Sequence, residues 1–231
     1  APDLLDGLVR STGLVTGTGA PGAEYHVAEL LRSHLEADLA RHGPELAAEL
    51  HRRAAGWWSA HDRPVEALAH AERAGDPDLL AGLTASWAPS LAGRGEHEAL
   101  DGALSALEAL APDASGREPR LAVAAAHVHL ARRDPHGLRR ALRRARRAGP
   151  VAAGSDAAAV RAATEQLAGR PASVAQRDRV PDEPASAALV RVGRATARLV
   201  ADRASAAVPE LDAALDLARR HHLELLELQA R

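Results

Sequence analysis

The chain has 231 residues and a formal net charge of −2, a length that suits one large domain or two small ones. It contains 56 Ala, 33 Leu and 29 Arg, but no Cys, Met, Phe, Ile, Lys or Asn. The absence of Cys and Lys excludes disulfides, cysteine zinc sites, thiolate nucleophiles and the lysine of a nucleotide-binding loop. Strands favour β-branched and aromatic residues, whereas Ala, Leu, Arg and Glu are strong helix formers, so the composition predicts an all-α fold.

The N-terminal region is the one part of the chain where strands are expected. Apolar residues at helical spacing over residues 4–9 predict a short helix. Residues 14–16 and 23–27 then have the character of two short strands, separated by a Gly- and Pro-rich loop at 17–22. The pattern predicts a small β-hairpin.

From Val27 onward the apolar pattern is helical, and its segments are bounded by Gly, Pro, Asp or Ser. The expected helices span about 27–39, 44–58, 64–74, 77–92, 96–110, 119–132, 135–148, 155–169, 185–201, 205–220 and 223–230. Helices of this length joined by short turns predict antiparallel pairs that stack side by side into a superhelix.

One helix pair resembles a tetratricopeptide repeat, whose period is about 34 residues. In residues 189–217, Gly193 lies in the first expected helix, and Ala207 and Ala214 lie seven apart in the second. The Pro-rich segment 170–184 has no clear apolar stripe and is a candidate break in the superhelix.

Three blocks of residues occur in order between Glu24 and Leu83. They are Tyr25-His26, then Leu50-His51-Arg52-Arg53-Ala54-Ala55 with Trp57, then Glu66-Ala67 with His70-Ala71 and Ala74-Gly75-Asp76. Together these blocks resemble the junction between the winged-helix segment and the helical superhelix of MalT-like, STAND-type, ATP-dependent regulators of the LuxR class. The resemblance implies that residues 1–42 are the end of a winged-helix segment and that residues 43–231 are a TPR-like superhelix.

The resemblance also implies a function, because in this family the superhelix binds an inducer or a partner protein. The chain contains neither a GxxxxGK[ST] loop nor a LuxR-type helix-turn-helix, so we expect DNA binding only through a module outside it. The expected function is therefore that of a regulatory segment of a bacterial transcription regulator. It would bind a small-molecule effector or a regulatory protein, need no cofactor and catalyse no reaction, with self-association as a further option.

The chain starts at Ala1 without an initiator Met or an apolar leader, so we expect a piece of a longer protein. No apolar run approaches the ~20 residues that a membrane helix needs. A cytoplasmic location without membrane contact is therefore expected.

The most cationic segment, residues 132–147, supplies the first candidate site. Arginines surround an apolar stripe of Leu138, Ala141, Leu142 and Ala145, and the candidate ligand residues among them are Arg139, Arg140, Arg143, Arg144 and Arg147. Guanidinium groups on one arc bind an anionic effector, a phosphate or nucleic acid. The alternative is a solvated helix face in an Arg-rich chain, and no pattern of a DNA-recognition helix accompanies it.

The second candidate ligand contacts are Trp57 and Trp58, since aromatic rings line pockets for flat ligands. Core packing is the alternative for at least two of the three tryptophans, which include Trp87. Adjacent helical residues point about 100° apart, so one of the pair must lie off the buried face. The His, Ser and carboxylate residues show no metal-binding or catalytic spacing.

The charges are unevenly distributed. Residues 1–116 carry a net charge of −10, and residues 117–231 carry a net charge of +8. This polarity fits either an anionic partner for the basic half or two halves that face each other. A stand-alone TPR-like scaffold that binds proteins is the alternative function, and nucleic-acid binding through the arginine segment is a third.

Overall fold

A computed structural model describes residues 2–17, 25–112, 114, 118–152, 154–169 and 179–230. Within these residues the chain forms 12 helices and one two-stranded sheet, which confirms the predicted all-α fold. The chain divides into two compact units, Ala1–His51 and Arg52–Arg231. The sequence-based boundary lies between residues 42 and 43, whereas the units separate inside a continuous helix.

The first unit begins with a helix and a hairpin. Its elements are α1 (Pro2–Thr12), β1 (Val15–Gly17), β2 (Tyr25–Val27) and α2 (Glu29–His42), followed by the start of α3. The strands are antiparallel, as predicted for a hairpin, and their register places Val15 opposite Val27. From residue 18 to residue 22 the expected Gly-rich loop lies outside the described residues.

Helix α2 is less buried than its apolar pattern predicts. Leu30 is 88% exposed and Leu35 is 53% exposed, and no residue of α2 is buried. The periodicity is therefore helical, but its apolar face is not part of a core here.

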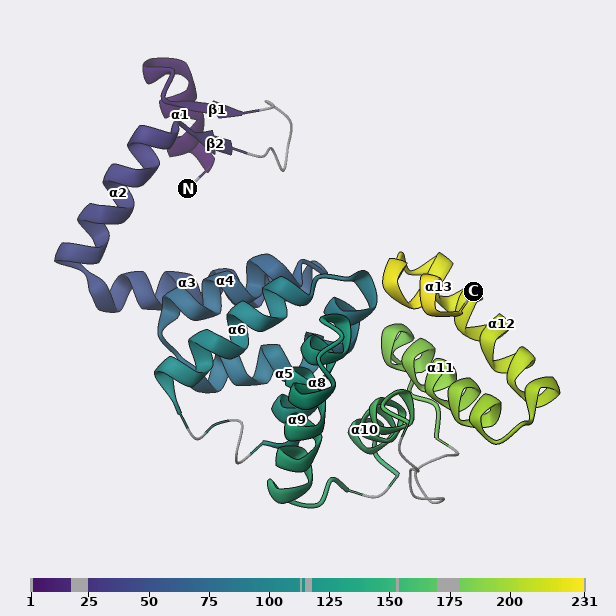
Figure 1. Ribbon diagram of the computed structural model, residues 1–231. Coiled ribbons are helices and arrows are strands. Elements are labelled where there is room, and N and C mark those ends of the chain that lie inside the picture. The colour runs from purple at the N-terminus through teal and green to yellow at the C-terminus, as the bar shows by residue number, and fades with distance from the viewer. Residues whose placement is uncertain are drawn as a thin grey trace. The chain divides into compact units, whose positions relative to one another are not determined.

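The second unit is entirely helical in its described part (Figure 1). Its helices are the C-terminal part of α3 (Pro44–Ala60), then α4 (Pro64–Ala74), α5 (Pro77–Arg94), α6 (His97–Leu110), α8 (Pro119–Ala131), α9 (Pro135–Arg147), α10 (Asp156–Leu167), α11 (Pro184–Val200), α12 (Ala204–Arg220) and α13 (Glu224–Ala230). Each lies within a few residues of the span expected from the sequence. Proline at the first position starts several of them, because its fixed φ suits a helix and its missing N–H costs nothing there.

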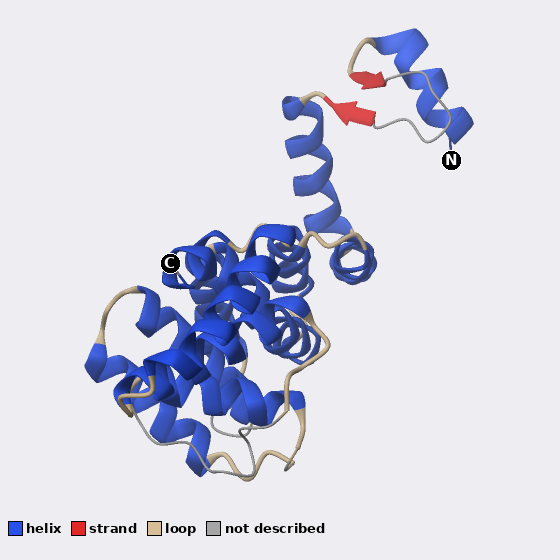
Figure 2. Ribbon diagram, turned by 90° about the vertical axis from the view of Figure 1, so that its right-hand side faces the viewer, coloured by secondary structure: helices blue, strands red, loops and turns tan. Residues whose placement is uncertain are grey.

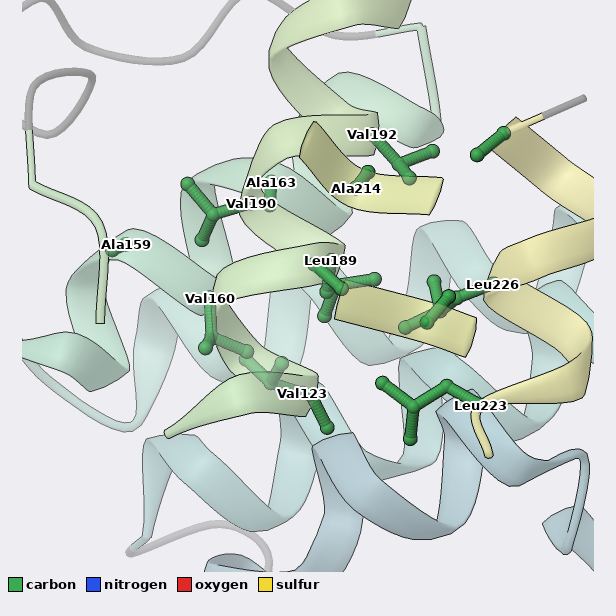
Figure 3. Packing of buried hydrophobic residues seen from close by; sticks show 14 of the residues in the cluster. Val123, Ala159, Val160, Ala163, Leu189, Val190, Val192, Ala214, Leu223 and Leu226 are labelled. Carbon is green, nitrogen blue, oxygen red and sulfur yellow. The ribbon is translucent and has the colours of Figure 1, made fainter. Parts of the chain in front are cut away.

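Neighbouring helices pack in pairs, most closely α8 with α9, α10 with α11, and α11 with α12 (Figure 1). Figure 2 shows that helices make up nearly all of the regular structure and that the two strands lie near the N-terminus. The chain reverses through three residues between α8 and α9 and between α11 and α12, as expected for antiparallel pairs. One cluster of buried residues joins α3–α6 with α8, and another joins α8–α13. Figure 3 shows the second cluster, with Val123, Val160, Leu189 and Leu223 among its members.

The small residues of the expected repeat are buried. Ala207 is fully buried and Ala214 is 1% exposed, so both lie at helix contacts. Membership of the tetratricopeptide class stays a prediction, as does the break at 170–184, of which residues 170–178 lie outside the described part. None of the described helices has the length and apolar character needed to cross a membrane.

Candidate functional site

Four of the five candidate arginines line one groove between α8 and α9. Its volume is about 460 Å³, and it is lined by Arg140, Arg143, Arg144, Arg147, His129 and the small residues Ala122, Ala125, Gly137 and Ala141. The lining therefore contains guanidinium groups, one imidazole and small side chains, with no carboxylate among them. A groove lined by guanidinium groups attracts anions electrostatically.

The sequence of α9 places the arginines on this groove. Its apolar positions, Leu138, Ala141, Leu142 and Ala145, are all buried, as predicted, and the six arginines occupy the exposed arc. Asp134 caps the helix by accepting hydrogen bonds from the N–H groups of Gly137 (2.9 Å) and His136 (3.0 Å). The Gly137 hydrogen bond, with further contributions from the charges of His129 and Arg140, lowers the pKa of Asp134.

Two arginines of α9 lie outside the groove lining. Arg139 is exposed on the same helix but is not among the lining residues. Arg146 donates through Nε to Glu165 Oε1 of α10 at 3.0 Å, and this hydrogen bond raises the pKa of Arg146. The arginine segment thus serves two purposes, since Arg146 joins two helices while four others surround the groove.

The tryptophans form a separate cluster around the end of α3. Trp57 is 53% exposed, stacks on His61 with ring centroids 3.9 Å apart and meets Trp58 edge-on at 4.7 Å. The guanidinium of Arg63 lies 5.5 Å from the Trp58 ring, within the range of a cation–π contact. Trp58 is partly buried, so the expectation that one of the pair lies off the buried face is met.

The third tryptophan has a structural role. Trp87 of α5 packs against the α3–α8 cluster, and its indole N–H donates to Ser59 Oγ at 3.0 Å. The Trp57–Trp58 pair lies on α3 and the arginine groove lies between α8 and α9, so these two candidate sites belong to different helices (Figure 1).

The second and third of the residue blocks that carry the family resemblance form the junction of α3, α4 and α5, whereas the first, Tyr25-His26, lies in β2. Gly75 ends α4 in a left-handed conformation with φ of 63°, and Asp76 caps α5 by accepting a hydrogen bond from Leu79 N at 3.0 Å. Arg52 Nε lies 3.2 Å from Asp76 Oδ2, which links the second block to the third. These residues therefore build the fold at this junction.

A cavity that the sequence did not indicate lies beside His127 of α8. It has a volume of about 170 Å³ and is lined by α5, α8, α10, the start of α11 and the segment before α10. His127 is 3% exposed, and its Nε2 lies 2.9 Å from Thr164 Oγ1. Burial lowers the pKa of His127 to about 4, so the imidazole is neutral at neutral pH.

A weak signal for this cavity exists in the sequence. His127 is the one polar residue in the segment Leu121–Val128, which is otherwise wholly apolar. A His in such a segment is expected to be buried with its apolar neighbours and to need a hydrogen-bond partner there. His129, two residues later, is half-buried beside Asp134. No group of three His, Asp or Glu residues within the described ranges is arranged to hold a metal ion.

Comparisons of this chain with models of known protein families, with curated proteins and with solved structures find no match. What the chain does is therefore inferred from its own residues and their geometry.

Proposed function

We propose that this chain is the regulatory, effector-binding segment of a MalT-like, LuxR-class bacterial transcription regulator. Two features support the proposal. The second and third of the residue blocks that resemble this family meet where α3, α4 and α5 join, and there Arg52 pairs with Asp76. The second unit consists of paired helices, the architecture that the resemblance implies for a sensor superhelix.

The effector site of this proposal is the arginine groove between α8 and α9. The observation that carries it is that Arg140, Arg143, Arg144 and Arg147 converge on one groove whose lining contains no carboxylate. The expected effector is an anion with at least one carboxylate or phosphate group, because guanidinium groups form paired hydrogen bonds with these planar or tetrahedral oxyanions.

Binding would act on the whole regulator through a shift between two conformations. A ligand shifts such an equilibrium only by the difference in its affinity for the two states. A groove formed by two helices provides that difference, because a change in the separation of α8 and α9 changes the distances between the guanidinium groups and His129. The isolated segment should therefore bind the effector without switching.

Titration of the chain with inorganic pyrophosphate at about 50 mM salt, followed by NMR or calorimetry, tests the site, since phosphate contacts are strongest at low salt. Arg143→Gln should weaken binding by about tenfold, the effect of losing one charge-assisted hydrogen bond. Arg139→Gln is the matched control, because it removes the same charge from the same helix outside the groove, and it should change affinity less than twofold. Equal effects of the two variants, or no saturable binding, would contradict the proposed site.

The regulator identity has its own test. The complete reading frame should encode a phosphate-binding loop before this segment and a helix-turn-helix after it. In a reporter assay of the complete protein, Arg143→Gln should reduce the response to effector while leaving DNA binding unchanged. A reading frame that lacks both modules would overturn the regulator proposal and favour the protein-binding scaffold.

A further inference from the structure

The cavity beside His127 is lined mainly by apolar side chains, with a smaller number of polar and charged ones. Val123 of α8 and Val160 of α10, both labelled in Figure 3, line it together with Ala88 and Pro89 of α5. Its volume of about 170 Å³ is smaller than the 460 Å³ of the arginine groove. Apolar walls with few polar groups are typical of small-molecule sites.

The charged groups at the rim already have partners. Arg120 Nε lies 3.1 Å from Glu118, and Asp156 Oδ1 lies 2.6 Å from Arg179. Glu183 accepts hydrogen bonds from the N–H groups of Ala185 and Ser186 at the start of α11. Because these rim charges are engaged in ion pairs or a helix cap, the cavity favours a neutral ligand over an ion.

The hydrogen bonds around His127 define its tautomer. Thr164 Oγ1 donates its proton to Val160 O at 2.9 Å, so it can only accept from His127 Nε2, which lies 2.9 Å away. The neutral ring therefore carries its proton on Nε2, and Nδ1 is a bare acceptor. Nδ1 is buried and has no hydrogen-bond partner.

The unpaired acceptor belongs to a residue of the cavity wall. His127 lines the cavity, whereas Thr164, its partner at Nε2, is not among the lining residues. A buried acceptor without a donor costs about 1–3 kcal/mol, so a ligand that supplies a donor there recovers a penalty already present in the fold.

A second acceptor adjoins the same cavity. Pro89 lies inside α5 and has no N–H, so the carbonyl of Ala85, four residues earlier, loses its helical donor. Ala85 and Pro89 both line the cavity. These two acceptors, one on a side chain and one on the backbone, favour a ligand that donates hydrogen bonds.

We propose that this cavity binds a small, neutral, largely apolar molecule with a hydroxyl group, of the phenol or short-chain alcohol class, whose hydroxyl donates to His127 Nδ1. The size is suitable, since an apolar cavity of about 150 Å³ holds one benzene ring. The site differs from the arginine groove in its lining residues and in the charge of its ligand. It therefore adds a neutral ligand to the anionic effector of the proposed function and does not depend on that function.

The test compares phenol with toluene, which has a methyl group in place of the hydroxyl and the same number of heavy atoms. Each is titrated into the complete 231-residue chain and followed by NMR or calorimetry. Phenol should bind at least about tenfold more tightly, the effect of one hydrogen bond to a buried acceptor. Equal affinities, or no saturable binding of phenol, would overturn the proposal.

His127→Gln separates the acceptor from the rest of the ring. A Gln amide N–H can replace Nε2–H toward Thr164, but Gln has no acceptor at the place of Nδ1. The variant should bind phenol about tenfold more weakly and bind toluene as before. Unchanged phenol affinity in a folded His127→Gln variant would contradict the assigned acceptor.

Two further variants keep the test decisive if His127→Gln does not fold. Ala157→Leu, at a partly buried position in the cavity wall, should fill the space and abolish phenol binding. Arg143→Gln, in the arginine groove, should leave phenol affinity unchanged. Phenol binding that survives Ala157→Leu, or that is lost in Arg143→Gln, would place phenol outside this cavity.

Discussion

The backbone of Gly193 in α11 lies directly against Ala163 in α10. A Cβ atom on Gly193 would be 2.8 Å from the Cα atom of Ala163 and 2.9 Å from its Cβ. Real Cβ atoms essentially never come this close, so the two helices owe their separation to the missing side chain at position 193. The glycine that resembles a repeat position in the sequence thus has a packing role in the structure.

Gly193→Ala should therefore destabilise the protein. Alanine gains up to about 1 kcal/mol of helix propensity over glycine. Overpacking typically costs about 1–3 kcal/mol, and here the obstacle includes backbone atoms that cannot rotate away. We expect a net loss of about 1–2 kcal/mol in the free energy of unfolding, measured by urea denaturation.

Gly102→Ala in α6 is the matched control. A Cβ atom there would meet nothing within 4 Å, so only the gain in helix propensity remains. This variant should be as stable as the parent chain or more stable by up to about 1 kcal/mol. Equal effects of the two substitutions would show that the contact with Ala163 does not set the helix separation.

Asp76→Ala should weaken the junction of α3, α4 and α5. The substitution removes the cap hydrogen bond from Leu79 N, worth about 1 kcal/mol, and the partner of Arg52, worth at most about 1 kcal/mol because both side chains are partly exposed. The denaturation midpoint should fall accordingly. The control is Asp78→Ala, which removes an exposed carboxylate in the same first turn and should change stability by only a few tenths of a kcal/mol. A loss for Asp78→Ala as large as that for Asp76→Ala would exclude the cap as the cause.

Helix positions were predictable from sequence because their signals are local. Pro64 and Gly75 mark the limits of α4 through their own backbone preferences, whatever packs around them. The apolar positions of α9, such as Leu138 and Leu142, likewise follow from periodicity alone. The same periodicity predicts a buried face on α2, but burial requires neighbouring elements, and Leu30 remains exposed.

The candidate sites depend on tertiary contacts that periodicity does not contain. Arg139 and Arg143 are both exposed residues of α9, and only the position of α8 decides that Arg143 lines the groove and Arg139 does not. His127 and His129 are equivalent in the sequence pattern, yet one is buried against α10 and the other faces Asp134. Which helix meets which is set by long-range packing, so these distinctions required the structure.

Glu210→Gln should destabilise the α11–α12 pair. Glu210 of α12 is 8% exposed, and its carboxylate lies 3.0 Å from Arg191, 3.1 Å from Arg198 and 3.8 Å from Arg194, all on α11. The amide would leave three guanidinium groups close together without an opposing charge. We expect a loss of about 2–3 kcal/mol in the free energy of unfolding.

Asp216→Asn makes the same chemical change on the same helix. Its partner Arg220 is exposed and lies one turn away, so the pair contributes at most about 0.5 kcal/mol. Thermal unfolding of the two variants side by side measures the difference. A shift as large for Asp216→Asn as for Glu210→Gln would mean that burial of Glu210 adds nothing to the strength of its ion pairs.

Burial of His127 should make stability depend on pH in a defined window. Its pKa is about 4 in the folded chain because burial disfavours the charged ring, against 6.5 for the unfolded chain. Between these values the unfolded state binds more protons than the folded state, so the free energy of unfolding decreases as pH falls from about 6.5 to about 4. The full shift corresponds to roughly 3 kcal/mol.

This pH range separates the effect of His127 on stability from the effects of the carboxylates. Asp134, whose pKa is lowered by the Gly137 N–H, stabilises the folded state above its unfolded pKa of 3.8 and loses that contribution only at lower pH. Urea denaturation at pH 7, 6 and 5 therefore reports mainly on histidines. His127→Gln, which cannot titrate at this position, should show a much smaller decrease over this range than the parent chain. Parallel stability curves for the two proteins would show that His127 is protonated as readily in the folded chain as in the unfolded one, and hence that its ring is accessible to water.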